Sequence, residues 1–303
     1  MAALEQMFED LEPGSVPNLR HFLKEAAYKY KVGMGVYVRK PSLHVWEFLT
    51  WEVISSFFCL DMFKSLSKHV RQLFKSEKLR KLLEFPVLFL GATPQNTPAM
   101  YSLMNYADLG LGTWYPDGGM FKIVEGMTSL ARELGVQFEM EQEALRIETD
   151  KDRATAVSCK GGRVFTADII VGACDYHHTE TRLLPEPYRN YTDKYWDTRT
   201  MAPSSLLWYL GINKRLQGLL HHNLFFDEDL GRHAQEIYEN PQWPSKPLFY
   251  VSAPSVTDSS VAPEACENLF VLVPVAPDLE DTPEIRERYF SVIMDRLESL
   301  IRQ

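Results

Sequence analysis

The chain has 303 residues, of which 45% are hydrophobic and 24% charged, the proportions of an ordinary globular protein with one large domain or two. Its net charge of −9 argues against a nucleic-acid-binding protein that works by overall basicity, because binding phosphates requires concentrated positive charge. No uninterrupted apolar run approaches the roughly 20 residues that span a bilayer, so we expect a protein that is soluble or lies on a membrane surface.

Cysteine spacing and the first residues indicate a cytoplasmic protein. The four cysteines lie far apart, with no Cys-x-x-Cys pair, which favours free thiols in a reducing compartment. Acidic residues stand near the start of the chain, where a signal peptide would carry basic residues followed by an apolar run. We therefore expect no signal peptide.

The first third of the chain has helical patterns. Residues 14–38 place apolar side chains along one side of a helix. Residues 44–82 form a long, mostly helical region whose first half is aromatic and apolar and whose second half is basic. Two such adjacent surfaces are typical of a helix that lies on anionic lipid. A core helix followed by a solvated charged helix explains the same pattern.

Residues 112–120 are the stretch around which we expect the chain to be organised. A buried apolar segment at 85–90 and a helix at 99–106 precede it. Apolar residues then recur at helical spacing from Met120 to Leu134, and Gly135 is well placed to end that helix. A short strand at 136–138 follows. The pattern predicts a turn, a helix and a strand packed together, and the residues alone leave a structural and a functional turn equally open.

The remainder of the chain carries mainly strand patterns. Residues 160–162 are predicted to form a turn between two short strands, and 168–171 to form a buried strand. The predicted strands are 144–148, 154–159, 163–165, 168–171, 206–212, 224–226, 248–253 and 269–274, and a final helix is expected at 283–301.

Common catalytic motifs are absent from the sequence. The pairs of glycines at 33 and 35 and at 110 and 112 both lack the third glycine of a dinucleotide-binding turn. Neither a Walker loop nor a Gly-x-Ser-x-Gly elbow is present. Adjacent histidines at 177–178 and 221–222 point apart and do not chelate a metal by themselves. We expect no metal site.

Residues 172–181 follow directly on the predicted buried strand. A strand end that leads into a helix is where α/β proteins usually bind a ligand, and small residues such as Gly172 and Ala173 allow a close approach to the backbone. Asp175 is also well placed to cap the following helix. The two interpretations are compatible.

Three motifs, in this order and at this spacing, resemble those of carotenoid desaturases: residues 114–120, 167–184 and 253–264. Residues 85–91, 105–108 and 269–277 match the same family, so the resemblance covers essentially the whole chain. The chain is similar to bacterial-type phytoene desaturases, a branch of the FAD-dependent amine-oxidase-like oxidoreductases.

The sequence departs from that family's pattern in three places. A complete member begins with an FAD-binding strand and glycine-rich turn and ends with a further flavin-contacting segment, so the chain resembles an internal fragment that lacks both termini and binds flavin poorly by itself. The family's carboxylate and arginine, proposed to act near the isoprenoid, correspond to Glu47 and Thr50, so only Glu47 is kept as a catalytic residue. Ala144 replaces the usual valine beside the adenine.

The resemblance implies a mixed α/β (α+β) architecture, a partial FAD-dependent oxidoreductase fold. Residues 1–112 are expected to form a helical, membrane-facing substrate lobe. Residues 113–186 are expected to be a returning segment of the FAD-binding domain. Residues 187–303 are expected to form a substrate domain with a mixed sheet and a C-terminal helix.

The activity that the resemblance implies is FAD-dependent desaturation of a C40 polyene, with hydride transfer to the flavin. The implied partners are a carotenoid or isoprenoid substrate and a membrane surface met through residues 45–81, which makes the protein peripheral to the membrane, and no nucleic acid. The residues implied to contact the cofactor are Gly118, Gly119, Ala144, Gly172, Ala173 and Asp175, and those implied to contact the substrate are Tyr106, Trp114, Tyr115 and His178.

Two other interpretations stay open. Another enzyme on the same scaffold, such as a carotenoid isomerase, a retinol-saturase-like reductase or an amine oxidase, shares these motifs. The chain is also compatible with a non-catalytic isoprenoid-binding remnant.

Overall fold

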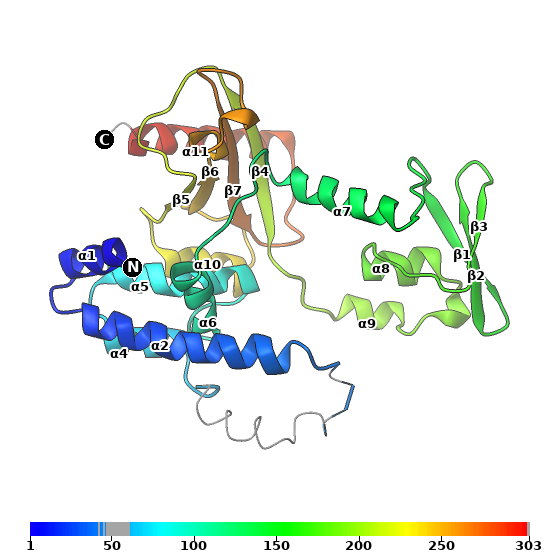
Figure 1. The fold of residues 1–303 in the computed structure, drawn as a ribbon, viewed down its shortest axis with the longest axis horizontal. Coiled ribbons are helices and arrows are strands. Elements are labelled where there is room, and N and C mark those ends of the chain that lie inside the picture. Colours follow the sequence, from blue (N-terminus) through cyan, green and yellow to red (C-terminus); the bar gives the residue numbers. More distant parts are fainter. Residues whose placement is uncertain (42, 45, 47–60, 302–303) are drawn as a thin grey trace. The chain divides into compact units, whose positions relative to one another are not determined.

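The structure is a computed structural model that describes all residues except 42, 45, 47–60 and 302–303. The chain divides into two compact units (Figure 1). Unit 1 combines Met1–Lys122 with Ala202–Gln303, and unit 2 is the intervening Ile123–Met201. Helices and antiparallel sheets make up both units, which confirms the predicted mixed fold class.

The N-terminal part of unit 1 is a layer of helices around its own core. Phe8, Phe22 and Phe74 are fully buried there, and Phe74 packs edge to face with each of the other two rings. The helical pattern predicted at 14–38 is confirmed, with a π-helical turn extending α2. The elements are α1 (Ala2–Leu11), α2 (Val16–Val32), the π-helical Gly33–Tyr37, α4 (Leu66–Leu73), α5 (Glu77–Glu84), the 3-10 helices Phe85–Leu90 and Ala99–Ser102, α6 (Leu103–Asn105) and the π-helical Tyr106–Gly110.

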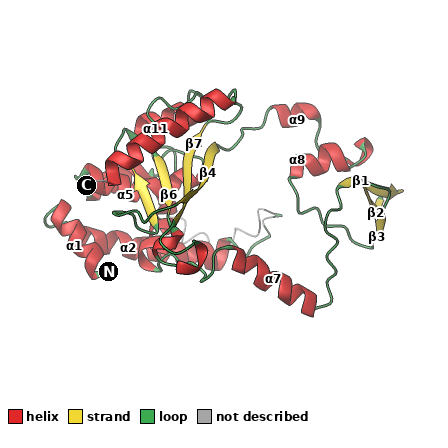
Figure 2. Cartoon of the chain, turned by 90° about the horizontal axis from the view of Figure 1, so that it is seen from above, coloured by secondary structure: helices red, strands yellow, loops and turns green. Residues whose placement is uncertain are grey.

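The C-terminal part of unit 1 is a four-stranded sheet in the order β4-β7-β6-β5. One face packs on the long helix α11, which lies along the sheet (Figure 2), so that Val271, Val273 and Ile293 share a core and are fully buried. The elements are β4 (Ser204–Ile212), β5 (His222–Phe225), α10 (Leu230–Tyr238), β6 (Phe249–Ser252), the 3-10 turns Pro254–Val256 and Ser259–Val261, β7 (Glu267–Val275) and α11 (Pro283–Ile301).

Every pairing in this sheet is antiparallel, where the sequence predicted a mixed sheet. The strand positions themselves were predicted closely, because short runs rich in β-branched, aromatic and other apolar residues, such as the one in β7, favour strands. Strand direction depends on which strands become neighbours, and the composition of a run does not carry that information.

Unit 2 contains a three-stranded antiparallel sheet in the order β1-β2-β3. The predicted turn at 160–162 joins β2 to β3, and both of its glycines have positive φ, as a tight hairpin requires. The elements are β1 (Ala144–Asp150), β2 (Arg153–Cys159), β3 (Val164–Thr166), α8 (Tyr176–His178) with the π-helical Thr179–Leu183, the 3-10 turn Glu186–Tyr188, and α9 (Asp193–Asp197).

Two predicted strands are absent. Residues 168–171 form no strand, and Ile169 and Val171 are about four-fifths exposed, at 81% and 82%. Residues 136–138 also lack strand structure. An apolar run forms a strand only beside a partner that accepts its backbone hydrogen bonds, and no described strand pairs with either segment.

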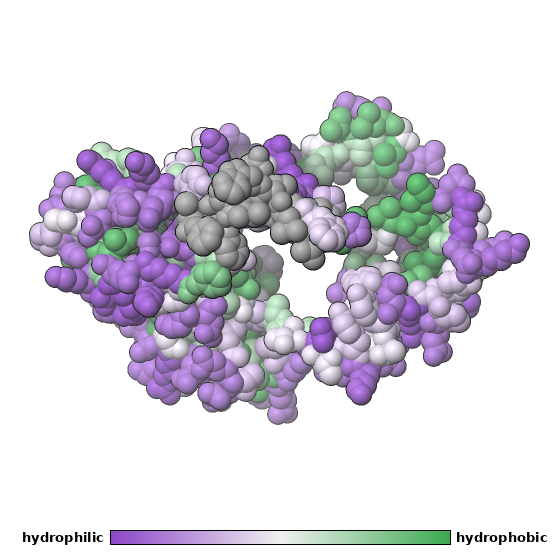
Figure 3. Space-filling model, turned by 90° about the horizontal axis from the view of Figure 1, so that it is seen from below, coloured by the Kyte–Doolittle hydropathy of each residue, from purple (hydrophilic) through white to green (hydrophobic). Residues whose placement is uncertain are grey.

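The predicted amphipathic helix is present as α7 (Phe121–Glu133), and Gly135 ends it at a φ of +87°. Its apolar face is not covered by the described residues: Met127 is 69% exposed and Leu130 is 57% exposed. Figure 3 shows hydrophobic residues, in green, exposed at the surface of the described chain. The predicted packing of turn, helix and strand into one unit is therefore wrong for the described chain.

Among the described residues, no helix has both the length and the hydropathy needed to cross a membrane.

Candidate functional site

The turn at 114–120 contacts the loop at 253–264, so two of the three motifs singled out in the sequence meet in space within unit 1. The backbone amide of Gly118 donates a hydrogen bond of 2.7 Å to Asp258 Oδ2. A Cβ placed on Gly119 would lie 3.6 Å from Val261 Cγ1. We call this cluster the motif junction, and it consists of Tyr115, Gly118, Gly119, His221, Thr257, Asp258 and Val261.

Both glycines of the junction have left-handed backbone conformations. Gly118 has a φ of +89° and Gly119 one of +98°, where residues with a Cβ are strained. The amide of Gly119 donates to the carbonyl of Pro116 at 3.1 Å. The turn is thus held by its own hydrogen bonds and by Asp258.

Tyr115 and His221 form the aromatic side of the junction. Their rings meet edge to face at a centroid distance of 4.6 Å. His221 Nδ1 lies 2.6 Å from the Thr257 hydroxyl. Burial lowers the pKa of His221, and the adjacent His222 lowers it further. At neutral pH the site therefore presents a neutral imidazole.

Burial, together with the charges around the junction, keeps Tyr115 protonated. Burial raises the pKa of Tyr115, and the nearby carboxylates of Asp258 and Asp117 raise it further. Hydrogen bonds from Ser260 and from the Gly118 amide lower the pKa of Asp258. The junction thus combines a neutral phenol, a neutral imidazole and an anionic carboxylate, which can donate and accept hydrogen bonds without carrying a net positive charge.

The second adjacent histidine extends this polar chain. His222 Nδ1 lies 2.5 Å from the Tyr250 hydroxyl, and the rings of His221 and His222 are 4.4 Å apart. A continuous series of rings therefore runs from Tyr115 to Tyr250 on β6.

Two other residues that the resemblance assigned to substrate lie near the turn in sequence. Tyr106 packs its ring 5.7 Å from that of Tyr30. Trp114 is 88% exposed, and its Nε1 donates to the carbonyl of Leu111 at 3.3 Å.

The remaining predicted residues lie in unit 2. Asp175 accepts a hydrogen bond from the amide of His178 at 2.8 Å, so its predicted helix cap is confirmed. A Cβ on Gly172 would lie 3.3 Å from Thr179 Cγ2, and the small residue therefore makes room for that side chain. Ala173 is exposed, as are Gly172, Asp175 and His178, and Ala144 begins β1 half-buried.

Glu47, the predicted catalytic carboxylate, lies outside the described residues, as does most of the aromatic half of 45–81.

The junction residue that the sequence did not connect with these motifs is His221, whose partner Thr257 lies in the motif 253–264. The histidine pair was considered only for metal binding, and no sequence signal connects it to a tyrosine more than a hundred residues earlier. Glu180 in unit 2 was missed in the same way. It is fully buried and accepts hydrogen bonds from Asn190, Tyr191 and the Tyr176 hydroxyl.

The turn at Gly118–Gly119 does not by itself provide a phosphate site for a flavin dinucleotide. A dinucleotide cofactor is held by backbone amides that point at its pyrophosphate, and both amides of the Gly118–Gly119 turn are used within the protein. The glycine-rich fingerprint is absent from the sequence. The turn fits a close approach of backbone to a neighbour and does not fit a phosphate cradle.

Comparison with known proteins identifies curated relatives. A carotenoid 3,4-desaturase of Haloarcula japonica is 36% identical over 94% of this chain and 58% of its own length. A zeta-carotene-forming phytoene desaturase of Myxococcus xanthus is 33% identical over 96% of this chain and 57% of its own length. The chain thus spans somewhat more than half the length of these relatives.

A solved oxidoreductase from Methanosarcina mazei aligns over 83% of this chain and 57% of its own, with a TM-score of 0.49 and 18% identity. The family described as flavin containing amine oxidoreductase matches residues 58–253, which include the turn of the junction and reach the start of its loop. The chain therefore belongs to the flavin containing amine oxidoreductase family.

Proposed function

We propose that this chain is part of an FAD-dependent desaturase that acts on a carotenoid-type polyene. The observation that carries the proposal is the 36% identity to a carotenoid 3,4-desaturase over 94% of the chain. The family membership of residues 58–253 supports a flavin enzyme, and the contact between motifs 114–120 and 253–264 supports a shared site.

Desaturation removes two hydrogens from adjacent carbons and leaves a double bond. In such enzymes the redox chemistry belongs to the cofactor, and the protein orients the substrate. We assign that orienting role to the junction, with Trp114 and Tyr115 facing the polyene. Gly118 and Gly119 provide close backbone packing beside the cofactor.

A chimera tests this function. The chain is joined to those segments of the Haloarcula japonica relative that lie outside the match, and the product is purified and supplied with phytoene. A yellow flavoprotein that forms coloured polyenes is the expected result. A flavoprotein that leaves phytoene colourless would contradict it and favour an isomerase, a reductase or an amine oxidase of the same scaffold. A colourless protein that still binds phytoene would favour the non-catalytic remnant.

We also propose that the protein is cytoplasmic and associates peripherally with membranes through residues 45–81. Trp46 is 77% exposed and Phe63 is 90% exposed, and large apolar side chains at a surface favour the bilayer interface. In the basic half, Lys68, Lys75 and Lys78 are exposed. Lys81 instead binds two backbone carbonyls, so fewer cations face solvent than the sequence alone indicates.

Co-sedimentation with anionic liposomes tests the membrane proposal. Deleting residues 45–63 should abolish binding, and the double substitution Trp46→Ser and Phe63→Ser should weaken it at least several-fold. Val292→Ser, which removes an exposed apolar residue from α11, is the matched control and should bind as the unchanged chain does. Equal sedimentation of all four proteins would show that residues 45–81 do not bind the membrane.

A further inference from the structure

A pocket of about 240 Å³ lies between α10 and the sheet of unit 1. Leu230, Ala234 and Ile237 of α10 form one wall, and Leu272 and Pro274 of β7 form the opposite one. The pocket is larger than the ~150 Å³ apolar cavity that accepts a benzene ring. It therefore has room for a section of a hydrocarbon ligand.

Two polar side chains beside this pocket, His233 and Tyr250, already have partners. His233 Nε2 donates to the carbonyl of Pro274, and its Nδ1 accepts from the amide of Leu248, both at 3.1 Å. Burial lowers the pKa of His233, which keeps the ring neutral. The Tyr250 hydroxyl is paired with His222. A polar ligand would find few free partners and would lose its hydration, whereas a hydrocarbon would lose nothing.

The pocket opens onto the face of the sheet opposite α11. Residues directly opposite each other in neighbouring strands share a face, and the register aligns two rows across the four strands. Leu207 is 43% exposed and Tyr209 is 77% exposed on this face. The first row is Leu224, Tyr250, Leu272 and Leu207, and the second row is His222, Ser252, Phe270 and Tyr209.

These rows connect the pocket with the motif junction. Tyr250 lines the pocket and its hydroxyl reaches His222, which neighbours His221 and, through it, Tyr115. A surface of apolar and aromatic side chains, with Ser252 and the two histidines among them, thus continues from the pocket to the junction within unit 1.

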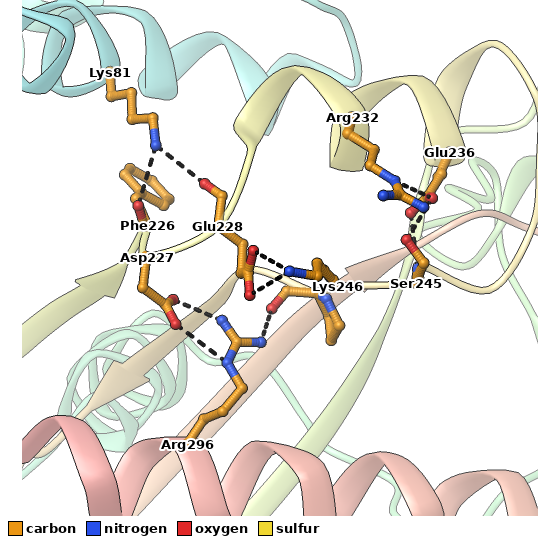
Figure 4. A network of polar contacts seen from close by, with 10 residues as sticks. Lys81, Phe226, Asp227, Glu228, Arg232, Glu236, Ser245, Lys246 and Arg296 are labelled. Carbon is orange, nitrogen blue, oxygen red and sulfur yellow. Dashed lines mark hydrogen bonds and ion pairs between the residues drawn. The ribbon is translucent and has the colours of Figure 1, made fainter.

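Hydrogen bonds and an ion pair hold the segment 226–228, whose Phe226 lines the pocket (Figure 4). Lys81 of α5 donates to the carbonyls of Phe226 and Glu228 at 3.2 and 3.1 Å. Arg296 of α11 binds both carboxylate oxygens of Asp227, at 3.2 and 2.6 Å. Cations from two helices therefore hold the connection between β5 and α10 in place beside the pocket.

We propose that this pocket binds one end of an isoprenoid hydrocarbon chain and that the two rows guide the rest of the chain toward the junction. The assignment of the ligand as a polyene rests on the proposed desaturase function. The mainly apolar lining and the paired side chains of His233 and Tyr250 favour an uncharged hydrocarbon, whatever reaction follows.

Binding of diphenylhexatriene, a polyene hydrocarbon that fluoresces only in apolar surroundings, tests the pocket on the 303-residue chain. Ala234→Phe fills the pocket and should weaken binding at least tenfold. Leu207→Lys places a charge on an exposed position of the first row, where folding is not at risk, and should weaken it several-fold. Gln235→Phe, exposed on the same helix, is the matched control and should bind like the unchanged chain. Squalene should displace the probe.

Equal affinity of the unchanged chain, the Ala234→Phe variant and the Leu207→Lys variant, with thermal unfolding unchanged, would overturn the proposal. The same substitutions in the chimera separate the two claims. If the Ala234→Phe chimera still desaturates phytoene with an unchanged KM, the pocket proposal is wrong and the proposed function stands. If the probe binds in the pocket but the chimera desaturates no phytoene, the proposed function is wrong and the pocket proposal stands.

Discussion

His69 is a buried histidine that the fold keeps uncharged. It stacks on Phe22 at a centroid distance of 5.6 Å, and its Nδ1 accepts a hydrogen bond of 2.8 Å from Lys64 Nζ. Burial lowers the pKa of His69 to about 4, and the positive charges of Lys29 and Lys64 contribute, against the smaller opposing effect of Glu25. An imidazolium at this position would face two cations.

This depressed pKa predicts that stability depends on pH. Between about pH 6.5 and pH 4, the unfolded chain binds a proton at His69 that the folded chain does not, so the free energy of unfolding should fall as pH decreases through this window. We expect a loss of about 1–2 kcal/mol, after allowing for solvent screening. Urea denaturation at several pH values between about 7 and 4 measures it.

The variant His69→Gln isolates this contribution, because an amide can still accept from Lys64 but does not titrate. Its free energy of unfolding should fall less steeply between about pH 6.5 and 4 than that of the unchanged chain. Parallel pH profiles for the two proteins would show that other groups cause the acid sensitivity.

For single residues, the sequence identified which positions belong to functional motifs but not which other residues they contact. The motif at 253–264 was recognisable, yet its Asp258 gains meaning only from the Gly118 amide 140 residues earlier. The helix cap at Asp175 was predictable because it depends on the next three residues. Short-range chemistry leaves a local signature, and long-range pairing does not.

Among the elements, the turn at Gly118–Gly119 requires a glycine, whereas the interior of helix α7 is destabilised by one. Gly119 has a φ of +98°, so Gly119→Ala should strain the backbone and cost more than about 1 kcal/mol. Gly126 lies in the interior of α7, where a Cβ would meet no other atom within 4 Å. Gly126→Ala should therefore stabilise the chain by roughly 0.5–1 kcal/mol.

Thermal and urea unfolding of these two variants give the comparison directly. Opposite signs are the expected result. If both substitutions stabilise the chain, the turn is not held in its left-handed conformation in solution. The close approach of Gly119 to Val261 then does not require a glycine.

Helices and strands were predicted correctly where the apolar residues have a strong period. Prediction failed where a segment forms a strand only if another strand pairs with it. The range 283–301 was predicted to the residue because its apolar residues repeat on one face of α11. Helix α10, which forms a wall of the pocket, went unpredicted, since its nine residues give too short a pattern. The run 168–171 looked like a strand because its composition is apolar, but composition carries no information about a pairing neighbour.

Across the whole molecule, the two units differ in how much apolar surface they bury. Unit 1 contains two hydrophobic clusters, one around Phe22 and one around Val271. In unit 2 the buried apolar residues are few and small or medium in size, and Ile147 and Leu183 are the largest of them. Local stability follows buried apolar contacts, so unit 2 should open at a lower free energy than unit 1.

Hydrogen exchange followed by mass spectrometry tests this difference. Amides of β1, β2 and β3 should exchange faster than those of β6 and β7, and low urea should accelerate the former first. A single cooperative opening with uniform protection would show that the units stabilise each other as one body. The domain division expected from the sequence, with limits near 112 and 186, stays a prediction until such data exist.

Unit 1 is assembled from two stretches of chain that unit 2 separates, and this arrangement governs how the protein can be made. Within this chain a ribosome delivers the helices before the sheet, at about 5–20 residues per second, and their core around Phe22 is complete within the first stretch. Strand β4 then emerges unpaired, because β7, its one neighbour among the described strands, is synthesised last of them. An apolar strand that waits unpaired is prone to aggregate, so the nascent chain depends on chaperones most during the interval between these two strands.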